Sequence, residues 1–514
     1  MKEFNTKEEL LEYAKQAETL TFGEIDKYNR LSNKKLKGGL GQIIEESYFG
    51  YEINSNQAPD FEELGVELKV TPIKELKNGQ ISAKERLVLN IINYEVEYLK
   101  TFETSSFWSK NADLLIMFYL WRKKWERSEY PITKVILHTF SEEDLLIIQQ
   151  DWETIIQKIR DGKAHELSEG DTNYLGAVTK GSSSKSVRKQ PNSDIPAKQR
   201  AFSLKQSYMT ALAREQITQK DLLYATKQKV RKKQDEKIDV VIKDTNILKK
   251  QTFDNYVLNL FDCYIGWTRE QLIEHFEIVN KGAKHVNYLI VQKILGVGGN
   301  TKEIHAKEFE KANIVAKTIE LKNGGIPEEN LKIVEINDFE EITEVEWEDS
   351  SLYNTLEATK YLFIIFDKLK NGTVILRGAK FWTMPPKDLD GIVRKVWEGE
   401  KTKFIEGVQL TYKPINNKKG YKISNNLVKL TDRNIIHLRP SAAEAQYCPA
   451  YKNEKGKSMN NAKRLPAPAK WINRPEHLKD VLQDDWMTKQ AFWLNKDYIF
   501  KQIKVNINEP IPKE

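Results

Sequence analysis

Two carboxylates and one amine stand close together in the sequence at a spacing that suits the hydrolysis of phosphodiester bonds. Asp60 is separated by six residues from Glu67, and Lys69 follows two positions later. Carboxylate oxygens are preferred ligands of Mg²⁺, and an ammonium group can stabilise the attacked phosphate or orient the attacking water. The pattern predicts a nuclease site, although the same residues at this spacing also occur on solvated strand faces and in ion pairs.

The residues around Glu67 and Lys69 are predicted to form a half-buried strand. Residues 66–70 alternate between apolar and charged side chains, which is the period of a strand with one buried face. The apolar members of this run would face a core: Val66, Leu68 and Val70. Glu67 and Lys69 then share the opposite face, and a short Leu-Gly turn after Asp60 can bring its carboxylate beside them.

The composition is that of a large globular protein with a basic surplus. The chain has 514 residues, 40% of them hydrophobic, so we expect roughly two to four domains. A net charge of +7 suits a polyanionic partner. Cys263 and Cys448 have neither metal-ligand nor disulfide spacing, which favours a reducing cytoplasm. No signal peptide opens the chain, and the longest apolar run, residues 114–121, is predicted to be a buried strand because it is too short to cross a membrane.

A charged stretch without glycine or proline divides the chain at residues 214–250. We interpret residues 1–213 as one domain, 214–250 as a helical linker with a basic face, and 251–514 as a second domain. The linker could be solvated or could contact DNA phosphates. In the first domain, a helix at residues 151–160 would end at Gly162 and bury four side chains at helical spacing: Trp152, Ile155, Ile156 and Ile159.

The second domain resembles a degenerate copy of the first. Three groups recur in the same order: Phe61-Glu62 and Lys69 recur as Phe309-Glu310 and Lys317, the apolar helix recurs as Leu389, Ile392, Val393 and Val396 before Gly399, and Phe202-Ser203-Leu204 recurs as Phe492-Trp493-Leu494. In this alignment Glu308 replaces Asp60 and Val315 replaces Glu67, so the copy has no metal site because valine cannot ligate Mg²⁺. A rival register uses Glu320-Leu321-Lys322, which keeps Glu-x-Lys.

Motifs along the first domain resemble the MutH family, the GATC-directed mismatch-repair nickases and the restriction endonucleases related to them. The likeness spans about residues 30 to 213 and includes these segments: Lys37-Gly38-Gly39-Leu40-Gly41-Gln42-Ile43-Ile44-Glu45, Pro59-Asp60-Phe61-Glu62-Glu63-Leu64-Gly65-Val66-Glu67-Leu68-Lys69, Trp108-Ser109-Lys110, Asp151-Trp152-Glu153, Tyr174-Leu175, Thr179-Lys180-Gly181 and Phe202-Ser203-Leu204-Lys205. The resemblance implies an α/β (α+β) fold of the restriction-endonuclease-like PD-(D/E)xK type, here as a tandem pseudo-repeat of two MutH-like domains.

The resemblance also implies an active site in the first domain. The catalytic residues would be Glu45, Asp60, Glu67, Lys69 and Lys110. The carboxylates of Glu45, Asp60 and Glu67, together with the backbone carbonyl of Leu68, would hold Mg²⁺. Lys69 would position the nucleophilic water, and Lys110 would lie near the scissile phosphate. Either one or two ions would serve.

The same resemblance implies how the sequence GATC would be read. The expected DNA contacts are Lys37, Gly38, Lys180, Gly181, Ser182, Ser203 and Lys205. Lys180 can donate to O6 and N7 of guanine. Where the nickases carry Arg-Pro, this chain has Val178-Thr179. Because Ser203 stands where the nickases place a tyrosine implicated in sensing adenine methylation, we expect that adenine N6-methylation does not govern cutting here.

A second reading loop is expected at residues 437–443, which contain the Arg-Pro that the first domain lacks. The contacts expected there are Arg439, Pro440, Ser441, Trp493 and Asn495. A reading loop beside a lost metal site predicts that the second domain binds a second GATC duplex as an allosteric effector. The alternative is that this half is a scaffold for the first.

The leading hypothesis is a type II restriction endonuclease that cuts both strands 5′ of the G of GATC with Mg²⁺. Palindromic GATC suits two chains that dimerise on DNA. A cognate methyltransferase would belong to the same restriction–modification system without binding the enzyme. The alternatives are a partner-activated mismatch-repair nickase, which the chain length and the second domain disfavour, and a non-enzymatic GATC-binding protein, which the complete set of site residues disfavours.

Overall fold

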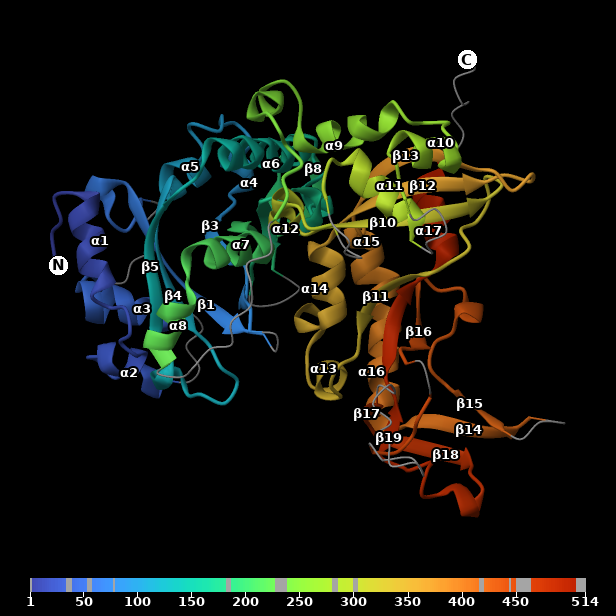
Figure 1. Ribbon diagram of the computed structural model, residues 1–514. Coiled ribbons are helices and arrows are strands. Elements are labelled where there is room, and N and C mark those ends of the chain that lie inside the picture. Colours follow the sequence, from blue (N-terminus) through green and yellow to red (C-terminus); the bar gives the residue numbers. More distant parts are fainter. Residues whose placement is uncertain are drawn as a thin grey trace. The chain divides into compact units, whose positions relative to one another are not determined.

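The chain folds into two compact units (Figure 1). A computed structural model describes residues 2–33, 39–52, 58–76, 79–181, 186–226, 238–279, 285–298, 304–415, 420–442, 445–449 and 464–504. The first unit comprises Met1–Leu260 and Val291–Ala316, and the second comprises Phe261–Ile290 and Lys317–Glu514. Residues 291–316, which the sequence placed in the second domain, therefore pack within the first unit.

The central sheet of the first unit contains both strands that the sequence predicted. Its order is β2-β1-β4-β5, with the bounds Ile81–Ala83, Val66–Glu75, Asp113–Leu120 and Ile132–Thr139. β1 is parallel to β4, whereas the β1–β2 and β4–β5 pairs are antiparallel. The parallel register aligns Val66 with Asp113, so β1 and β4 begin at the same edge of the sheet.

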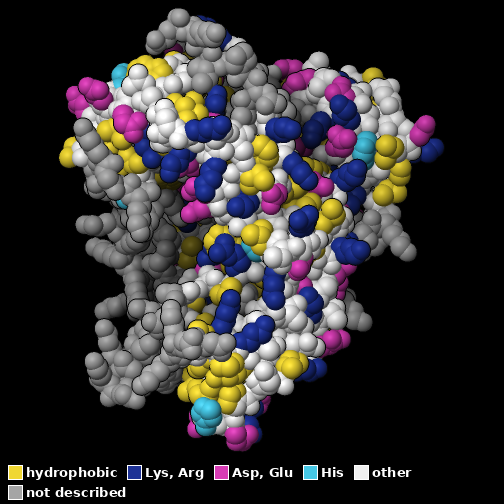
Figure 2. All heavy atoms as spheres, turned by 90° about the vertical axis from the view of Figure 1, so that its right-hand side faces the viewer, with side chains coloured by type: hydrophobic (Ala, Val, Ile, Leu, Met, Phe, Trp, Pro, Cys, Tyr) yellow, Lys and Arg dark blue, Asp and Glu magenta, His cyan; other side chains and the backbone are white. Residues whose placement is uncertain are grey.

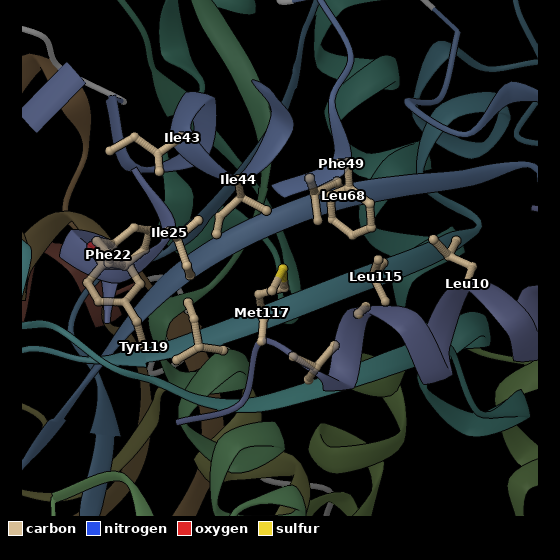
Figure 3. Packing of buried hydrophobic residues seen from close by; sticks show 14 of the residues in the cluster. Leu10, Phe22, Ile25, Ile43, Ile44, Phe49, Leu68, Leu115, Met117 and Tyr119 are labelled. Atoms are coloured by element: carbon tan, nitrogen blue, oxygen red, sulfur yellow. The ribbon is translucent and has the colours of Figure 1, made fainter. Parts of the chain in front are cut away.

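Helices near the N-terminus cover one face of this sheet, as Figure 3 shows. They are α1 (Lys7–Lys15), α2 (Phe22–Ile25), α3 (Gly39–Ile43) and the π-helix η2 (Ile44–Phe49). Their apolar side chains pack against those of Val66, Leu68, Leu115 and Met117. Val66 and Leu68 thus face a core as predicted, which turns Glu67 and its neighbour Lys69 toward the other face.

A second sheet and several helices complete the first unit. The sheet is antiparallel with the order β3-β9-β6 (Leu87–Ile91, Arg200–Leu204 and Leu175–Thr179), and β7 (Val187–Gln190) and β8 (Ser193–Lys198) form a hairpin. The helices include α4 (Tyr94–Glu97), α5 (Ser106–Asn111), α7 (Gln206–Gln216), α8 (Gln219–Thr226) and α12 (Lys307–Ala312). α9 (Phe253–Asp262) begins in this unit and α11 (Val286–Ile294) ends in it.

The helix predicted at residues 151–160 is longer than expected. α6 spans Glu142–Arg160 and begins after Ser141, whose side chain accepts a hydrogen bond from the amide of Asp144. Its four predicted core residues are fully buried: Trp152, Ile155, Ile156 and Ile159. Gly162 follows with φ +71°, as a helix end favours. Across the residues that the structure describes, no helix is both long and apolar enough to cross a membrane.

The second unit is built from smaller sheets. Their orders are β10-β12-β13 (Ile314–Lys322, Lys360–Lys368, Val374–Trp382), β11-β20-β16 (Leu331–Glu335, Gln490–Leu494, Ile436–Pro440), β15-β14-β18 (Tyr421–Asn425, Val408–Pro414, Ala469–Asn473) and β17-β19 (Arg464–Pro466, Trp486–Thr488). Its helices include α10 (Arg269–His275), α13 (Glu340–Thr343), α14 (Ser351–Ala358), α15 (Pro386–Asp388), α16 (Arg394–Glu406) and α17 (Lys496–Ile503).

Several pairings of the first unit recur in the second. β12 and β13 are antiparallel as β4 and β5 are, and β11-β20-β16 repeats the antiparallel order β3-β9-β6. The Tyr208 hydroxyl donates to Asp144 at 2.9 Å, and the Tyr498 hydroxyl donates to Asp388 at 2.6 Å. Both aspartates lie near the start of the long helical segment of their unit.

The predicted correspondence between the buried helix of the first domain and residues 389–396 is wrong in its register. Ile392, expected on a buried helix face, is 48% exposed, and α16 continues through Gly399 to Glu406, with Gly407 following it. The π-helix η9 (Leu389–Val393) precedes α16 and rotates the side chains that follow it relative to a regular α-helix. Trp397 is buried instead, and it precedes Gly407 by the same interval that separates Trp152 from Gly162.

The predicted helical linker also differs from the structure. α8 ends at Thr226, residues 227–237 lie outside the described ranges, and the chain is not helical from 238 to 244. The amides of Val241 and Ile242 donate to the buried carboxylate of Glu308 at 2.9 and 2.7 Å. Glu308, expected as the counterpart of Asp60 in the second domain, is therefore a structural carboxylate of the first unit.

Candidate active site

Asp60 and Glu67 are held side by side by reciprocal contacts with the backbone. The amide of Asp60 donates to Glu67 Oε2 at 3.1 Å, and the amide of Leu68 donates to Asp60 Oδ2 at 3.0 Å. Gly65, with φ +64°, ends the short 3₁₀ turn Glu62–Leu64 that reverses the chain between the two carboxylates. The Leu-Gly turn thus does what the sequence predicted.

Two lysines from different elements converge on Glu67. Lys69 Nζ lies 2.5 Å from Glu67 Oε1, and Lys110 Nζ lies 3.6 Å from the same oxygen. Lys110 reaches this position because α5 ends at Asn111 immediately before β4, which begins at the same edge of the sheet as β1. Lys110 lies on a helix rather than at the end of a strand, yet it joins the site as expected.

Glu45 belongs to the same electrostatic cluster. It lies in the π-helix η2, and such helices occur frequently at functional sites. Burial raises the pKa of its carboxyl, and the charge of Glu67 raises it further, while Lys69 and Lys110 oppose the shift. The five side chains expected to be catalytic are therefore close enough to influence one another.

Tyr51 is a member of this cluster that sequence reasoning missed. Its side chain is buried, and its hydroxyl has no hydrogen-bond partner in the described part of the chain. Burial and the charges of Asp60, Glu45 and Glu67 raise its pKa well above the usual value. Its position in the chain between Glu45 and Asp60 is the one signal in the sequence that could have drawn attention to it.

The donor set of the site fits a divalent cation. Burial and the neighbouring Glu67 charge raise the pKa of Asp60 to about 7. Such a shift arises where carboxylates lie close together without enough positive charge to balance them. Oxygen ligands of this kind suit Mg²⁺, which needs few protein ligands because it keeps several waters. Within the described ranges, no three Asp, Glu, His or Cys side chains are arranged as a complete metal-binding group. The expected three-carboxylate set of Glu45, Asp60 and Glu67 is therefore not preformed.

The residues expected to contact DNA in the first unit fall into three groups. Lys180 and Gly181 are exposed at the end of β6, where a reading loop would need them. Lys37, Gly38 and Ser182 lie outside the described residues. Ser203 and Lys205 are 0% and 1% exposed.

The burial of Ser203 and Lys205 has clear structural reasons. Ser203 lies inside the β3-β9-β6 sheet, directly across from Gly176. Lys205 Nζ donates to the carbonyl of Thr172 at 2.5 Å and to that of Ala312 at 3.4 Å. Both side chains are buried in the interior of the unit, so the structure argues against the DNA contacts that were expected of them.

In the second unit, the expected contacts divide in the same way. Arg439 and Pro440 are exposed, and the Arg439 guanidinium lies 4.9 Å from the centre of the half-buried Trp493 ring. Ser441 is 9% exposed, and its hydroxyl donates to Glu335. Asn495 is 2% exposed and donates to the carbonyl of Asn434. Ser441 and Asn495 therefore serve the packing of the unit.

Known proteins share sequence with the part of the chain that carries most of this site. The family profile of the DNA mismatch repair enzyme MutH matches residues 49–151, which include β1, β4 and all the site residues except Glu45. The DNA mismatch repair protein MutH of Shewanella woodyi is 32% identical over 187 residues, covering 35% of this chain and 78% of that protein. The MutH protein of Pasteurella multocida is 26% identical over 186 residues, covering 35% of this chain and 82% of that protein. These matches define the class of nuclease.

A further relative matches nearly the whole length. Type II restriction enzyme Sau3AI of Staphylococcus aureus is 40% identical over 517 residues, covering 98% of this chain and 99% of that protein. The chain therefore belongs to the type II restriction enzymes related to MutH. It is a site-specific deoxyribonuclease, and DNA is its substrate.

We expect the affinity of the site for a divalent cation to depend on pH through Asp60. With a pKa of about 7, Asp60 is mostly protonated at lower pH and must lose its proton to bind a cation, so the affinity should fall about tenfold for each pH unit below about 7 and level off above it. Calorimetric titration of the protein with Mg²⁺ over this range would measure the slope. In Asp60→Asn the affinity should be weak and the slope should flatten; an unchanged slope would assign the dependence to another group.

Proposed function

We propose that the enzyme recognises double-stranded GATC and hydrolyses the phosphodiester bond 5′ of the G in both strands with Mg²⁺. The observation that carries this proposal is the convergence of Asp60, Glu67, Lys69 and Lys110 at one edge of the β1–β4 pair. The GATC target and the position of the cut rest on the resemblance to the MutH family and on the exposed Lys180 and Gly181 at the end of β6.

The roles of the residues follow from their positions. When bound, Mg²⁺ would lower the pKa of a coordinated water and offset charge on the phosphate. Asp60 and Glu67, with Glu45 and the carbonyl of Leu68 completing the set, would hold it. Lys69 would orient the water that attacks phosphorus, and Lys110 would stabilise the charge on the phosphate while the bond to the 3′ oxygen breaks. These roles require the carboxylates to be ionised and the lysines to be protonated.

The second unit would bind a second GATC duplex and not cut it. The strand β10, whose first three residues belong to the first unit, begins at Ile314, so its second residue, Val315, would correspond to Glu67 in β1. Ser350 caps α14 and accepts from the amide of Tyr353, as Ser105 caps α5 and accepts from that of Trp108; counted from these two caps, Thr355 would correspond to Lys110. These replacements support a tandem repeat in which the second copy has lost the groups that hold a metal.

Exposed groups support the effector role of this unit. Arg439 and Pro440 lie on β16, which takes the place of β6 in the recurring sheet.

A single intact site per chain means that cutting both strands requires two chains on one palindrome, so dimerisation on DNA is part of the proposal. A cognate methyltransferase would protect the host DNA. Two other roles, a partner-activated nickase and a non-enzymatic binding protein, are separated by the experiment below.

The proposal predicts sequence-specific linear products from unmethylated plasmids carrying one or two GATC sites. The two-site plasmid should be cut faster, because its second site can occupy the second unit at high effective concentration. Trp493→Ala should remove that acceleration while leaving the slow cutting of the one-site plasmid. The readout is gel electrophoresis of timed digests with Mg²⁺.

Each alternative has its own outcome on the same gel. Nicked circles alone would indicate a nickase that waits for a partner, and intact plasmid would indicate a binding protein. Equal rates on both plasmids would assign the second unit to a scaffold. Parallel digests of plasmids carrying N6-methyladenine test the expectation that this mark does not govern cutting, and strong protection by the mark would overturn it.

A further inference from the structure

The sheet β15-β14-β18 of the second unit has one strongly basic face. β14 is the central strand, antiparallel to β15 and parallel to β18. The register places Lys413 directly opposite Lys422 and Gln409 opposite Lys470. Side chains of directly paired residues, and of residues two apart on one strand, lie on the same face. That face, here called the lysine face, consists of Gln409, Thr411, Lys413, Lys422, Ser424, Lys470 and Asn473.

The lysine face has no acidic counterpart. The three strands contain no Asp or Glu, and all three lysines are exposed. Among the residues that the structure describes, Lys413, Lys422 and Lys470 form no ion pair. Like charges directly opposite on paired strands destabilise a sheet, so the Lys413–Lys422 pair costs stability unless an anion lies against it.

Protection against aggregation explains part of this arrangement, but not the placement of two lysines directly opposite each other. Lysines on edge strands prevent edge-to-edge pairing, which could explain Lys422 on β15 and Lys470 on β18. Lys413 lies on β14 beyond Thr411, the last residue of β14 that pairs with β18, so it also stands at a locally unpaired edge; one lysine of the Lys413–Lys422 pair would be enough to protect that end of the sheet. The stem of Lys470 lies close to Gly407: a Cβ at Gly407, whose φ is +95°, would lie 3.1 Å from Lys470 Cγ. Glycine at this position lets the lysine chain lie along the face.

We propose that the lysine face binds the sugar–phosphate backbone of a DNA duplex held by the second unit. This inference rests on the proposed function, because it concerns the duplex that the second unit binds. Ammonium groups on a polar face without acids complement phosphates, and such contacts supply affinity without reading sequence. Figure 2 looks at the side toward which β14 and β15 extend in Figure 1, and Lys and Arg side chains are gathered on the described surface there.

The test compares two triple variants of the full chain, each carrying Glu67→Gln so that DNA is not cut. One variant is K413Q/K422Q/K470Q. The control is K370Q/K395Q/K479Q, which removes the same charge from exposed lysines of the same unit outside this sheet. Binding of duplexes with and without GATC is measured at several salt concentrations, together with the number of duplexes bound per chain and the melting temperature.

The lysine-face variant should bind both duplexes more weakly than the control, with a salt dependence shallower by about 2–3 in log–log slope, since each lost phosphate contact removes about 0.9. It should retain the cutting rate of one-site plasmids when Glu67 is restored. If two duplexes bind per chain but both variants share one slope, this inference is wrong and the effector role stands. If only one duplex binds per chain, both fail.

Discussion

Replacing Glu67 by Gln should abolish cleavage and leave DNA binding in place. The Glu67 carboxylate contacts three other members of the site: it accepts from the Asp60 amide and pairs with both Lys69 and Lys110. Glutamine keeps the volume and one acceptor oxygen but removes the charge that would hold a cation. Loss of one group that acts in the transition state costs about 10²–10³ in rate, and loss of a metal ligand should cost at least that much.

The measurement is the initial rate of plasmid linearisation beside a filter-binding titration of the same protein. Glu63→Gln is the matched control, because Glu63 is an exposed carboxylate in the 3₁₀ turn that leads into β1. It should cut at nearly the wild-type rate. If Glu67→Gln cut within about tenfold of wild type, the site would have to lie elsewhere. If it lost DNA binding as well, Glu67 would be a fold residue rather than a catalytic one.

The parts of the site that the sequence predicted are those fixed by local structure. Glu67 and Lys69 share a face because β1 alternates, and Asp60 returns to them because Gly65 can adopt a positive φ. Lys110 was placed by resemblance alone, since its approach to Glu67 depends on the parallel pairing of β1 with β4, a contact between distant parts of the chain. The fold class was also predicted by resemblance. The family motifs occur along the chain in the family's order, whereas the pairing of the strands could not be derived from the sequence.

The errors came from side chains whose surroundings are set by tertiary structure. A lysine is almost always exposed, so nothing local marks Lys205 as a buried donor to the carbonyls of Thr172 and Ala312. Likewise, no periodicity reveals a π-helix, and Ile392, which lies within the π-helix η9, is exposed rather than buried. Glu308 was aligned with Asp60 by its neighbours, whereas its partners are amides more than sixty positions earlier. The burial of Lys205 and the role of Glu308 both depend on contacts between distant parts of the chain.

Sequence reasoning also missed a buried ion pair in the first unit, and the loss of one partner of this pair should destabilise that unit strongly. Lys311, on α12, is 4% exposed, and its Nζ lies 2.9 and 2.8 Å from the two carboxylate oxygens of Asp144 on α6. The Tyr208 hydroxyl on α7 donates to the same carboxylate, so three helices meet at one charge. α12 leads directly into β10, so the ion pair also fixes the segment through which the chain enters the β10-β12-β13 sheet.

Replacing Lys311 by Met should destabilise the first unit by about 3–5 kcal/mol, because it leaves the Asp144 charge buried without a cation. Lys307→Met on the same helix is the control: Lys307 is part-exposed and lies 4.0 Å from Glu215, so its loss should cost about 0–1 kcal/mol. Hydrogen exchange of peptides from α6, α7 and α12 reports the opening of this unit separately from the other. The double variant Asp144→Asn, Lys311→Met should recover most of the loss, since a pair removed together leaves no stranded charge. A double variant as unstable as Lys311→Met would show that the packing of the lysine stem, and not its charge, holds the three helices together.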